Sequence, residues 1–475
     1  MRNPLFGRGN DIVFERQAPE PAVIAHALER TEHRVFWLDD AGDAAAYPAL
    51  SAWLDVDLAV VGGGYLGLWS AIMAKQRNPD ARVVLLEGQT IGWAASGRNG
   101  GFVEASLTHG EGNGESRWPA EMETLTRLGL ENLATMERQV AELGLDCQWE
   151  HNGSIDVALE EHQLEWLEPD KDGFLDRAAV QGKVGSPTYL GGRYHHDTAL
   201  VHPARLAKEL ARAAAELGVE VFENSQVNGL SEENGAVTLT TARAGVRAAH
   251  VVLATNAFPS LLKRYRLYTV PVYDYVLMTE PLSAAQLASI GWQGREGMAD
   301  LANQFHYYRL TADNRVLFGG YDAVYHFGRE VRASYEDRTE TFRTLASHFF
   351  TTFPQLEGLR FTHRWAGAID TSSQFCAFFG LDLGGRVVSA AGFTGLGVGA
   401  THFAAEVLLD RLAGLTTERT ELEMVRRKPL PFPPEPFAAA GIAATKWAMD
   451  RADHHEGRRN LLLRTLDAVG LGFDS

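Results

Sequence analysis

The stretch that decides the fold is Val56-Asp-Leu-Ala-Val-Val-Gly-Gly-Gly-Tyr-Leu-Gly67, and Val83-Val-Leu-Leu-Glu87 completes it. The apolar run 58–61 is typical of a buried parallel strand, and a second such run ends at Glu87. Glu87 stands 20 residues after Gly67, the distance at which an acid binds the ribose hydroxyls of a dinucleotide. An acid there favours a free 2′-hydroxyl, so NADP is excluded as the expected ligand.

Gly62, Gly64 and Gly67 follow the G-x-G-x-x-G spacing. The first glycine allows a tight turn, the second a close approach to a pyrophosphate, and the third close packing of helix on strand. The helix is expected to start near Leu66, and its free N–H groups and positive dipole end point at the phosphates. Because strand, glycines, helix and acid occur in the required order, the sequence predicts a dinucleotide-binding unit.

Composition limits the class of protein. The chain has 475 residues, of which 45% are hydrophobic and 22% charged, and this is typical of a globular protein with room for two domains. The net charge of −17 argues against partners such as nucleic acid and anionic membrane surfaces. Cys147 and Cys376 match no zinc or redox motif, and no signal sequence or apolar run of membrane-spanning length is present. We expect a cytoplasmic protein without a membrane span.

The strand–glycine–helix pattern recurs, so the chain returns to the nucleotide-binding domain. The run 249–257 is an apolar strand that ends in small residues, and 237–241 with 245–255 predicts a hairpin leading into it. The segment 386–399 repeats the pattern, with 400–412 as its helix. We assign 55–110, 195–265 and 355–415 to this domain, interleaved with a substrate domain of 111–194 and 266–354.

The substrate domain is predicted to be antiparallel, from aromatic-rich strands at 270–279, 305–310 and 316–321. A helix is expected at 119–145. Residues 1–54 form an N-terminal arm anchored by Val35-Phe-Trp-Leu38, and 416–475 a C-terminal arm with a proline-rich linker and a helix from about residue 438. The predicted fold class is α/β, with a Rossmann-like domain of the glutathione-reductase type.

Small residues fill the loop after Glu87, most densely in Ser96-Gly-Arg-Asn-Gly-Gly101. A loop without bulky side chains lets the backbone come close to a flat ligand.

These segments together resemble the FAD-dependent D-amino-acid oxidase superfamily, and within it the gamma-glutamylputrescine oxidase-like branch. The resemblance spans roughly residues 55–412. The segments that carry it are the glycine unit with Glu87, the 95–101 loop, Val201-His-Pro-Ala-Arg205, Ala254-Thr-Asn-Ala257, Tyr307-Tyr-Arg-Leu-Thr311, Leu317-Phe-Gly-Gly320 and Gly392-Phe-Thr-Gly-Leu-Gly397.

The resemblance implies FAD as cofactor and assigns residues to its parts. The glycine unit would hold the pyrophosphate and Glu87 the adenosine ribose, while the 392–397 turn would point a helix N-terminus at the pyrimidine end of the flavin. The implied cofactor residues are Gly62, Gly64, Tyr65, Leu66, Gly67, Glu87, Ser96, Gly97, Arg98, Asn99, Gly100, Gly101, Val227, Ala254, Thr255, Asn256, Gly392, Thr394, Gly395, Leu396 and Gly397.

Candidates for the substrate side come from two strands. They are His306, Tyr308 and Arg309 on 305–310, and Tyr273 and Tyr275 on 272–277. Strand periodicity places His306 and Tyr308 on one face and Tyr307 and Arg309 on the other, so only one face can meet the substrate. Arg309 is a candidate for bidentate binding of a substrate carboxylate, with a structural ion pair as the alternative.

Two departures from relatives bear on the chemistry. Sarcosine-oxidase-like relatives carry an oxygen-activating lysine on the strand that matches 316–321, where this chain has Phe318. They also tether the flavin through a cysteine just before the segment that matches 370–375, and 365–369 contains none, so we expect non-covalent FAD. The pairs His195-His196 and His454-His455 lack further ligands at metal-binding spacing, and no metal site is predicted.

The resemblance implies an oxidoreductase that oxidises the C–N bond of an amine, with hydride transfer to the flavin and hydrolysis of the imine to an aldehyde or keto acid. The substrate is a polyamine-derived amine, a gamma-glutamyl amine, a secondary amine or an amino acid, and oxygen reoxidises the flavin. The alternatives are a dehydrogenase that uses a quinone or protein acceptor, and a non-catalytic flavoprotein subunit. Whether the chain forms a homodimer is open.

Overall fold

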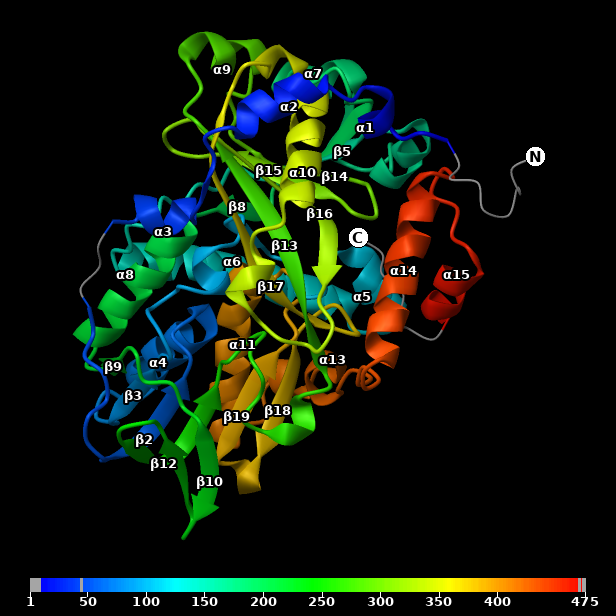
Figure 1. Ribbon diagram of the computed structural model, residues 1–475. Coiled ribbons are helices and arrows are strands. Elements are labelled where there is room, and N and C mark those ends of the chain that lie inside the picture. The colour runs from blue at the N-terminus through cyan, green and yellow to red at the C-terminus, as the bar shows by residue number, and fades with distance from the viewer. Residues whose placement is uncertain (1–9, 43–45, 469–470, 472–475) are drawn as a thin grey trace.

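Two large β-sheets make up the molecule, one in each half of Figure 1, and helices cover them. The computed structural model describes residues 10–42, 46–468 and 471. No described helix is long and apolar enough to cross a membrane.

The nucleotide-binding sheet is built around the opening motif. Its order is β10 (Gly229–Glu233), β11 (Ala236–Thr240), β12 (Gly245–Leu253), β2 (Leu54–Val61), β3 (Val83–Leu86) and β9 (Glu220–Phe222). β19 (Val387–Ala391) lies parallel to the end of β12, and β18 (Phe378–Asp382) pairs antiparallel with β19. β12, β2, β3 and β9 are parallel, as the α/β prediction requires.

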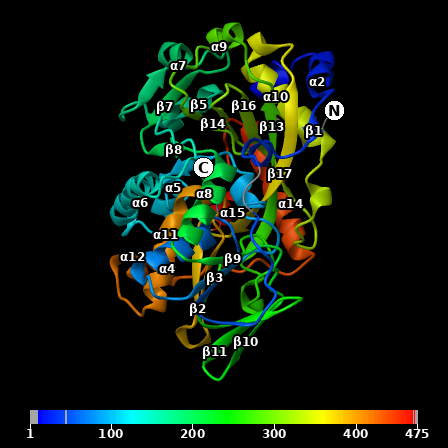
Figure 2. The same cartoon turned by 90° about the vertical axis from the view of Figure 1, so that its left-hand side faces the viewer.

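The apolar run of β2 is explained by burial on both faces. Leu58 and Val60 face the helices α4 (Tyr65–Arg77), α8 (Pro203–Glu216) and α11 (Gly397–Leu412), which stand in front of the sheet in Figure 2. Ala59 and Val61 pack in a second core on the other face, with residues of the β11–β12 hairpin. A strand buried on both faces has a continuous rather than an alternating apolar pattern.

The second sheet is mainly antiparallel and forms the opposite half of the molecule. Its order is β1 (Glu32–His33), β17 (Phe361–Ser372), β13 (Thr269–Thr279), β16 (Val316–Tyr325), β15 (His306–Leu310), β14 (Gly297–Asp300), β5 (Ser154–Ala158), β7 (Gly191–His195) and β6 (Phe174–Asp176). The helix α10 (Thr339–Thr352) packs Phe349 and Phe350 into a core with Tyr275, Tyr308 and Phe318. The predicted fold class is confirmed.

Shorter elements complete the chain. The short strands β4 (Phe102–Glu104) and β8 (Thr198–Leu200) pair with each other. The remaining α-helices are α1 (Val13–Arg16), α2 (Pro21–Leu28), α3 (Phe36–Asp40), α5 (Glu111–Arg117), α6 (Met122–Glu142), α7 (Arg177–Lys183), α9 (Ala284–Ile290), α12 (Glu418–Glu421), α13 (Glu423–Arg426), α14 (Phe437–Asp453) and α15 (Leu461–Ala468).

Two segments lie outside the half that we predicted for them. β17 was expected in the nucleotide-binding domain within 355–415, but it pairs with β13 along its whole length in the second sheet. α6 was expected in the substrate domain within 111–194, but Leu133 and Met136 pack in the core that holds α4 and α11. In both cases the partner is remote in sequence, and local periodicity does not identify it. The other domain boundaries stay a prediction.

The N-terminal arm is anchored by the aromatic residues of the 35–38 segment. Phe36 and Trp37 are buried in a cluster with Met278, Leu317 and Trp365 of the second sheet. The arm therefore packs on the strands that border the cavity described below.

Replacement of Gly62 by alanine tests the turn between β2 and α4. Gly62 has φ +116°, and a Cβ there would lie 2.4 Å from the carbonyl oxygen of Ala254, the residue that follows β12. We expect Gly62→Ala to lower the free energy of unfolding by about 2 kcal/mol or more and to reduce FAD occupancy, because backbone strain and a clash act together. Urea titration and flavin absorbance measure the two effects.

The control is Gly182→Ala in α7, where an added Cβ meets no atom within 4 Å. It should raise stability slightly, by about 0.5 kcal/mol, because alanine favours a helix. Equal stability and FAD content of Gly62→Ala and the wild type would contradict this account of the turn.

Candidate active site

The N-terminus of α4 presents free backbone donors to a cavity. The N–H of Tyr65 donates to Oγ of Ser96 over 3.0 Å. For the N–H groups of Gly64 and Leu66, both of which line the cavity, no hydrogen-bond acceptor is seen in the described chain. Unpaired amides at a helix N-terminus bind phosphate groups, so this end of the cavity fits a pyrophosphate.

Glu87 is held firmly at the end of β3. Its carboxylate accepts hydrogen bonds from the N–H of Gly63 (2.7 Å), the N–H of Gln89 (2.8 Å) and Nε1 of Trp93 (3.0 Å). The residue is buried and lines the cavity, so its position is compatible with the predicted contact to a ribose.

The 96–101 loop is fixed by donors from the second sheet and from the N-terminal arm. Nε1 of Trp37 donates to the carbonyl oxygen of Asn99 (2.9 Å), and Nε1 of Trp365 donates to that of Arg98 (2.8 Å). The side chain of Asn99 closes the loop by accepting from the N–H of Gly101 (2.8 Å). These hydrogen bonds hold the conformation of the loop, which lies between the two sheets.

One cavity of about 1070 Å³ runs from the α4 turn past this loop to the second sheet. That exceeds the usual size of a small-molecule pocket, and suits an extended cofactor with space beside it. The predicted cofactor residues that line it are Gly62, Gly64, Tyr65, Leu66, Glu87, Ser96, Arg98, Asn99, Gly100, Gly101, Val227, Ala254, Thr255, Asn256, Thr394, Gly395, Leu396 and Gly397.

Gly67, Gly97 and Gly392 do not line the cavity. A Cβ on Gly67 would lie 1.9 Å from the carbonyl oxygen of Gly62, and one on Gly97 2.2 Å from that of Gly92. Each of these two glycines thus permits a close approach of backbone. Gly395, in contrast, faces open space in the cavity, since the nearest atom to its Cβ position is 3.8 Å away.

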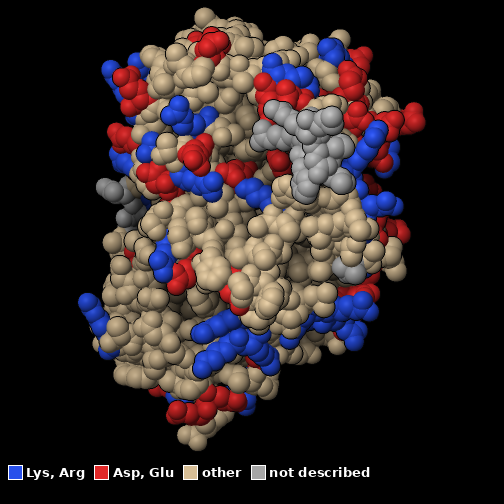
Figure 3. Space-filling view, turned by 45° about the vertical axis from the view of Figure 1, so that its right-hand side comes forward, with Lys and Arg blue, Asp and Glu red and all other residues tan. Residues whose placement is uncertain are grey.

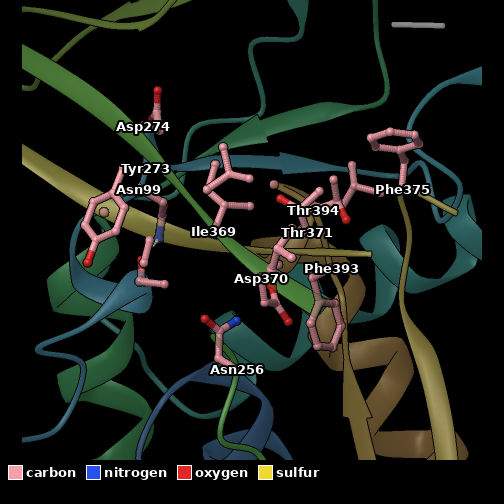
Figure 4. A pocket seen from close by; sticks show the side chains of 18 of the residues that line it. Asn99, Asn256, Tyr273, Asp274, Ile369, Asp370, Thr371, Phe375, Phe393 and Thr394 are labelled. Carbon is pink, nitrogen blue, oxygen red and sulfur yellow. Dashed lines mark hydrogen bonds between the residues drawn. The ribbon is translucent and has the colours of Figure 1, made fainter. Parts of the chain in front are cut away.

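Asp370 occupies the wall between the two sheets, at the end of β17 (Figure 4). It accepts a hydrogen bond from the N–H of Gly392 (2.5 Å) and a further one from the side chain of Asn256. Burial nevertheless raises its pKa to about 7. Thr394 closes the turn, since its hydroxyl accepts from the N–H of Ser372 (3.2 Å). A titratable carboxyl therefore lies where the helix α11 points into the cavity.

Tyr307 and Asp274 form a buried pair directly behind the 96–101 loop. The hydroxyl of Tyr307 donates to Oδ2 of Asp274, and the N–H of Gly320 donates to Oδ1 (3.1 Å). A Cβ on Gly100 would lie 2.6 Å from the Tyr307 ring, so loop and ring are in contact. Burial raises the pKa of Asp274 to about 6 and that of Tyr307 well above its usual value.

The sheet is irregular at Asp274, which lines the cavity. Tyr273 pairs with Val324 and Tyr275 with Gly320, so three residues of β16 bulge opposite Asp274. Such bulges redirect side chains next to active sites. Tyr273, a predicted substrate contact, lines the cavity, and Figure 4 shows Tyr273 and Asp274 along β13.

Two further carboxylates line the cavity from β4 and β5. The side chain of Glu104 forms no hydrogen bond or ion pair in the described chain, and that of Asp156 is 3.0 Å from Nε2 of His195. Desolvation by the surrounding protein and the nearby charges of Asp156 and Asp197 raise the pKa of Glu104 to about 7, although the residue itself is exposed. This part of the cavity therefore attracts cations.

Three of the predicted substrate contacts face the core instead. His306 lies between Asp300 (2.7 Å) and His348 (2.9 Å), and the hydroxyl of Tyr308 bonds to that of Tyr189 (2.7 Å). The Tyr275 hydroxyl donates to the carbonyl oxygen of Tyr335 (2.7 Å). None of the three lines the cavity. The expectation that these residues contact the substrate is therefore wrong. Strand periodicity correctly placed His306 and Tyr308 on the same face of β15, but that face packs on α10.

Arg309 also has a different place from the predicted one. It shares the face of Tyr307, but it is 3% exposed and does not line the cavity. Its Nη1 donates to the carbonyl oxygens of Val201 (2.7 Å) and Gly101 (3.4 Å). Burial lowers the pKa of the guanidinium to about 10. Arg309 therefore supports the 96–101 loop instead of binding a substrate carboxylate.

Sequence reasoning did not select Asp274, Asp370, Glu104 or Asp156. The available signal was an acid inside an apolar strand, as in Val-Tyr-Asp274-Tyr-Val, because a buried carboxylate needs a reason to be there.

The described geometry is that of a flavoprotein: a Rossmann-type phosphate turn, a glycine loop and a second sheet with titratable groups. The sequence pattern of the DAO family, described as FAD dependent oxidoreductase, matches residues 57–411. The chain is 32% identical over 439 residues to gamma-glutamylputrescine oxidoreductase of Escherichia coli K12, covering 87% of this chain and 97% of that one. It is 29% identical over 405 residues to a probable oxidoreductase OrdL of Haemophilus influenzae, covering 81% and 89%.

Among solved structures, glycine oxidase from Geobacillus kaustophilus has a TM-score of 0.63 and 21% identity, covering 77% of this chain and 96% of that one. The fold is thus shared with that enzyme. The chain belongs to the DAO family of FAD-dependent oxidoreductases. The predicted superfamily, its gamma-glutamylputrescine oxidase-like branch and the FAD cofactor are confirmed.

We expect the FAD to be bound without a covalent bond to cysteine. Cys147 and Cys376 are fully buried, do not line the cavity, and have pKa values that burial raises to about 12. Acid precipitation of the holoenzyme should therefore release all yellow colour into the supernatant. Colour retained in the washed pellet would contradict this prediction.

Proposed function

We propose that the protein oxidises the C–N bond of an amine that carries a second cationic group, such as a polyamine-derived amine, with oxygen as electron acceptor. The observation that supports this most is the run of carboxyl groups, Asp274, Glu104 and Asp156, along the cavity beside the flavin loop. A substrate amine needs acceptors of this kind. The similarity to gamma-glutamylputrescine oxidoreductase points to the same substrate class.

Bound FAD supplies the hydride acceptor. The chain supplies position and charge: the 96–101 loop provides a flat wall, and Tyr307 with Asp274 lies next to it. Asp274 accepts a hydrogen bond from the substrate nitrogen and Tyr307 keeps the carboxylate in place. The carbon beside that nitrogen is thereby held close to the loop, and correct positioning alone accounts for a large part of such a rate enhancement. The product imine is hydrolysed to an aldehyde or keto acid.

Glu104 and Asp156 bind the second cation of the substrate. The side chain of Glu104 is free to pair with it, and occupation by an ammonium group would favour its ionised form. A simple monoamine leaves these carboxylates unpaired, so we expect it to be a poor substrate.

The second candidate function is a dehydrogenase that passes electrons to a quinone or a protein. Phe318 favours it, because this fully buried ring occupies the strand on which sarcosine-oxidase-like relatives carry their oxygen-activating lysine. The Arg and Lys side chains of the described chain that line the cavity are Arg98, Lys446 and Arg459, and each forms an ion pair, with Glu336, Asp322 and Asp467 respectively.

Anaerobic mixing of the holoenzyme with a panel of amines tests the proposal. Diamines and gamma-glutamyl amines should bleach the flavin absorbance. The rate should fall as the pH drops below about 6, where Asp274 becomes protonated, because its pKa is raised to about that value by burial. Asp274→Asn should slow bleaching about tenfold or more and lack this pH dependence.

The matched control is Asp313→Asn, a carboxylate on the turn between β15 and β16 that does not line the cavity. It should leave rate and pH profile unchanged. Failure of every amine to bleach the flavin, or an unchanged pH profile in Asp274→Asn, would overturn the proposal.

The acceptor is decided by aerobic turnover. If oxygen is the acceptor, one hydrogen peroxide should form for each amine consumed, as an oxygen electrode with a peroxidase assay measures. Turnover that occurs only with an added quinone or dye would favour the dehydrogenase.

A further inference from the structure

Three segments meet beside the mouth of the cavity: 263–267, 326–332 and 426–437. The N–H of Phe432 donates to the carbonyl oxygen of Leu267 (2.7 Å). Nη2 of Arg329 donates to that of Pro433 (2.6 Å), and Nη1 to that of Arg266 (3.4 Å). We call the surface made by these segments the mouth face, because several residues of 430–437 also line the cavity.

Large apolar side chains stand out from the mouth face. Leu267 is 40% exposed, Phe327 64%, Leu430 58% and Phe437 68%. In Figure 3, which brings the side of α14 and α15 forward, a broad tan area is bordered below by a gathering of blue side chains. Single exposed apolar residues are ordinary, but a group of this kind marks an interaction surface.

The same face is basic in an acidic protein. Its three segments carry Lys263, Arg264, Arg266, Arg329, Arg332, Arg426, Arg427 and Lys428 against Glu330 and Glu435, whereas the whole chain has 44 basic and 61 acidic residues. Ion pairs engage Arg264 with Asp382, Arg332 with Glu330, Arg426 with Glu421 and Arg427 with Glu423.

Lys263, Arg266, Arg329 and Lys428 form no direct ion pair in the described chain, although Arg329 lies near enough to Glu435 to lower the pKa of that carboxyl group. Arg266 and Arg329 donate to carbonyl oxygens, and Lys428 lies 3.1 Å from the hydroxyl of Tyr265. The face therefore presents positive charge that no direct ion pair neutralises, among exposed Leu and Phe side chains.

We propose that the mouth face docks on an anionic phospholipid surface. Phosphate headgroups neutralise the four cations while Leu267, Phe327, Leu430 and Phe437 enter the headgroup and acyl boundary, which is the chemistry of peripheral membrane binding. A two-fold contact between copies of the chain is disfavoured, because it would bring the same four cations against each other. The net charge of −17 for the whole chain does not reveal that this one face is basic. The proposal goes beyond the proposed function and does not depend on it.

Sedimentation with vesicles tests the proposal with the holoenzyme. Vesicles of phosphatidylcholine mixed with phosphatidylglycerol should bind the protein at low salt, vesicles of phosphatidylcholine alone should not, and high salt should release it. The double variant Lys263→Glu/Phe327→Ser changes two exposed side chains outside the cavity lining, and should weaken binding about tenfold or more, since each basic residue near the surface contributes strongly.

The matched control is Arg243→Glu/Leu415→Ser, which makes the same kinds of change at two exposed positions away from the mouth face. It should bind like the wild type. Flavin absorbance and melting temperature check that each variant is folded, and Lys263→Glu alone serves if the double variant is not. Absence of wild-type binding to the anionic vesicles, equal binding by the variants and the wild type, or a dimer in solution that the double variant splits would each overturn the proposal.

Discussion

Hydrogen bonds to the 96–101 loop connect the two halves of the molecule, and the rest of the structure depends on them. The carbonyl oxygens of the loop accept hydrogen bonds from Trp37 of the N-terminal arm, Trp365 of β17 and Arg309 of β15. The loop itself follows β3 of the nucleotide-binding sheet. Three elements that are remote in sequence thus hold one short segment that belongs to the nucleotide-binding half. The cavity that runs past this segment is lined by residues of both sheets. Arg309 is fully enclosed, and loss of such a donor would leave buried carbonyl groups without partners.

Buried carboxyl groups give the cavity its chemical character. Burial raises the pKa of Asp274 to about 6 and that of Asp370 to about 7, and each of these carboxyl groups lies where a ligand can restore its charge. Removing a carboxylate from water is costly unless a partner compensates it. A cavity that tolerates several such groups is prepared for a cationic ligand, and this links the electrostatics of the fold to the proposed amine substrate.

The nucleotide half could be predicted from sequence because its signals are local. The Gly62 turn, Glu87 and the 96–101 loop each depend on backbone conformations that only certain residues allow. The side chains that line the cavity from the substrate half were harder to predict from the sequence. Periodicity grouped Tyr307 with Arg309, but which face meets the cavity is decided by α10, and Asp274 lies at an irregular part of the pairing between β13 and β16. The placement of β17 in the second sheet likewise follows from remote pairing.

The measurement that tests the central claim most directly is a crystal structure of the holoenzyme with a slow or inhibitory diamine. The account predicts the isoalloxazine ring against Gly100 and Gly101, with one amine nitrogen within hydrogen-bonding distance of Asp274 and the second near Glu104. A flavin ring away from the 96–101 loop, or a diamine that contacts neither carboxylate, would contradict it.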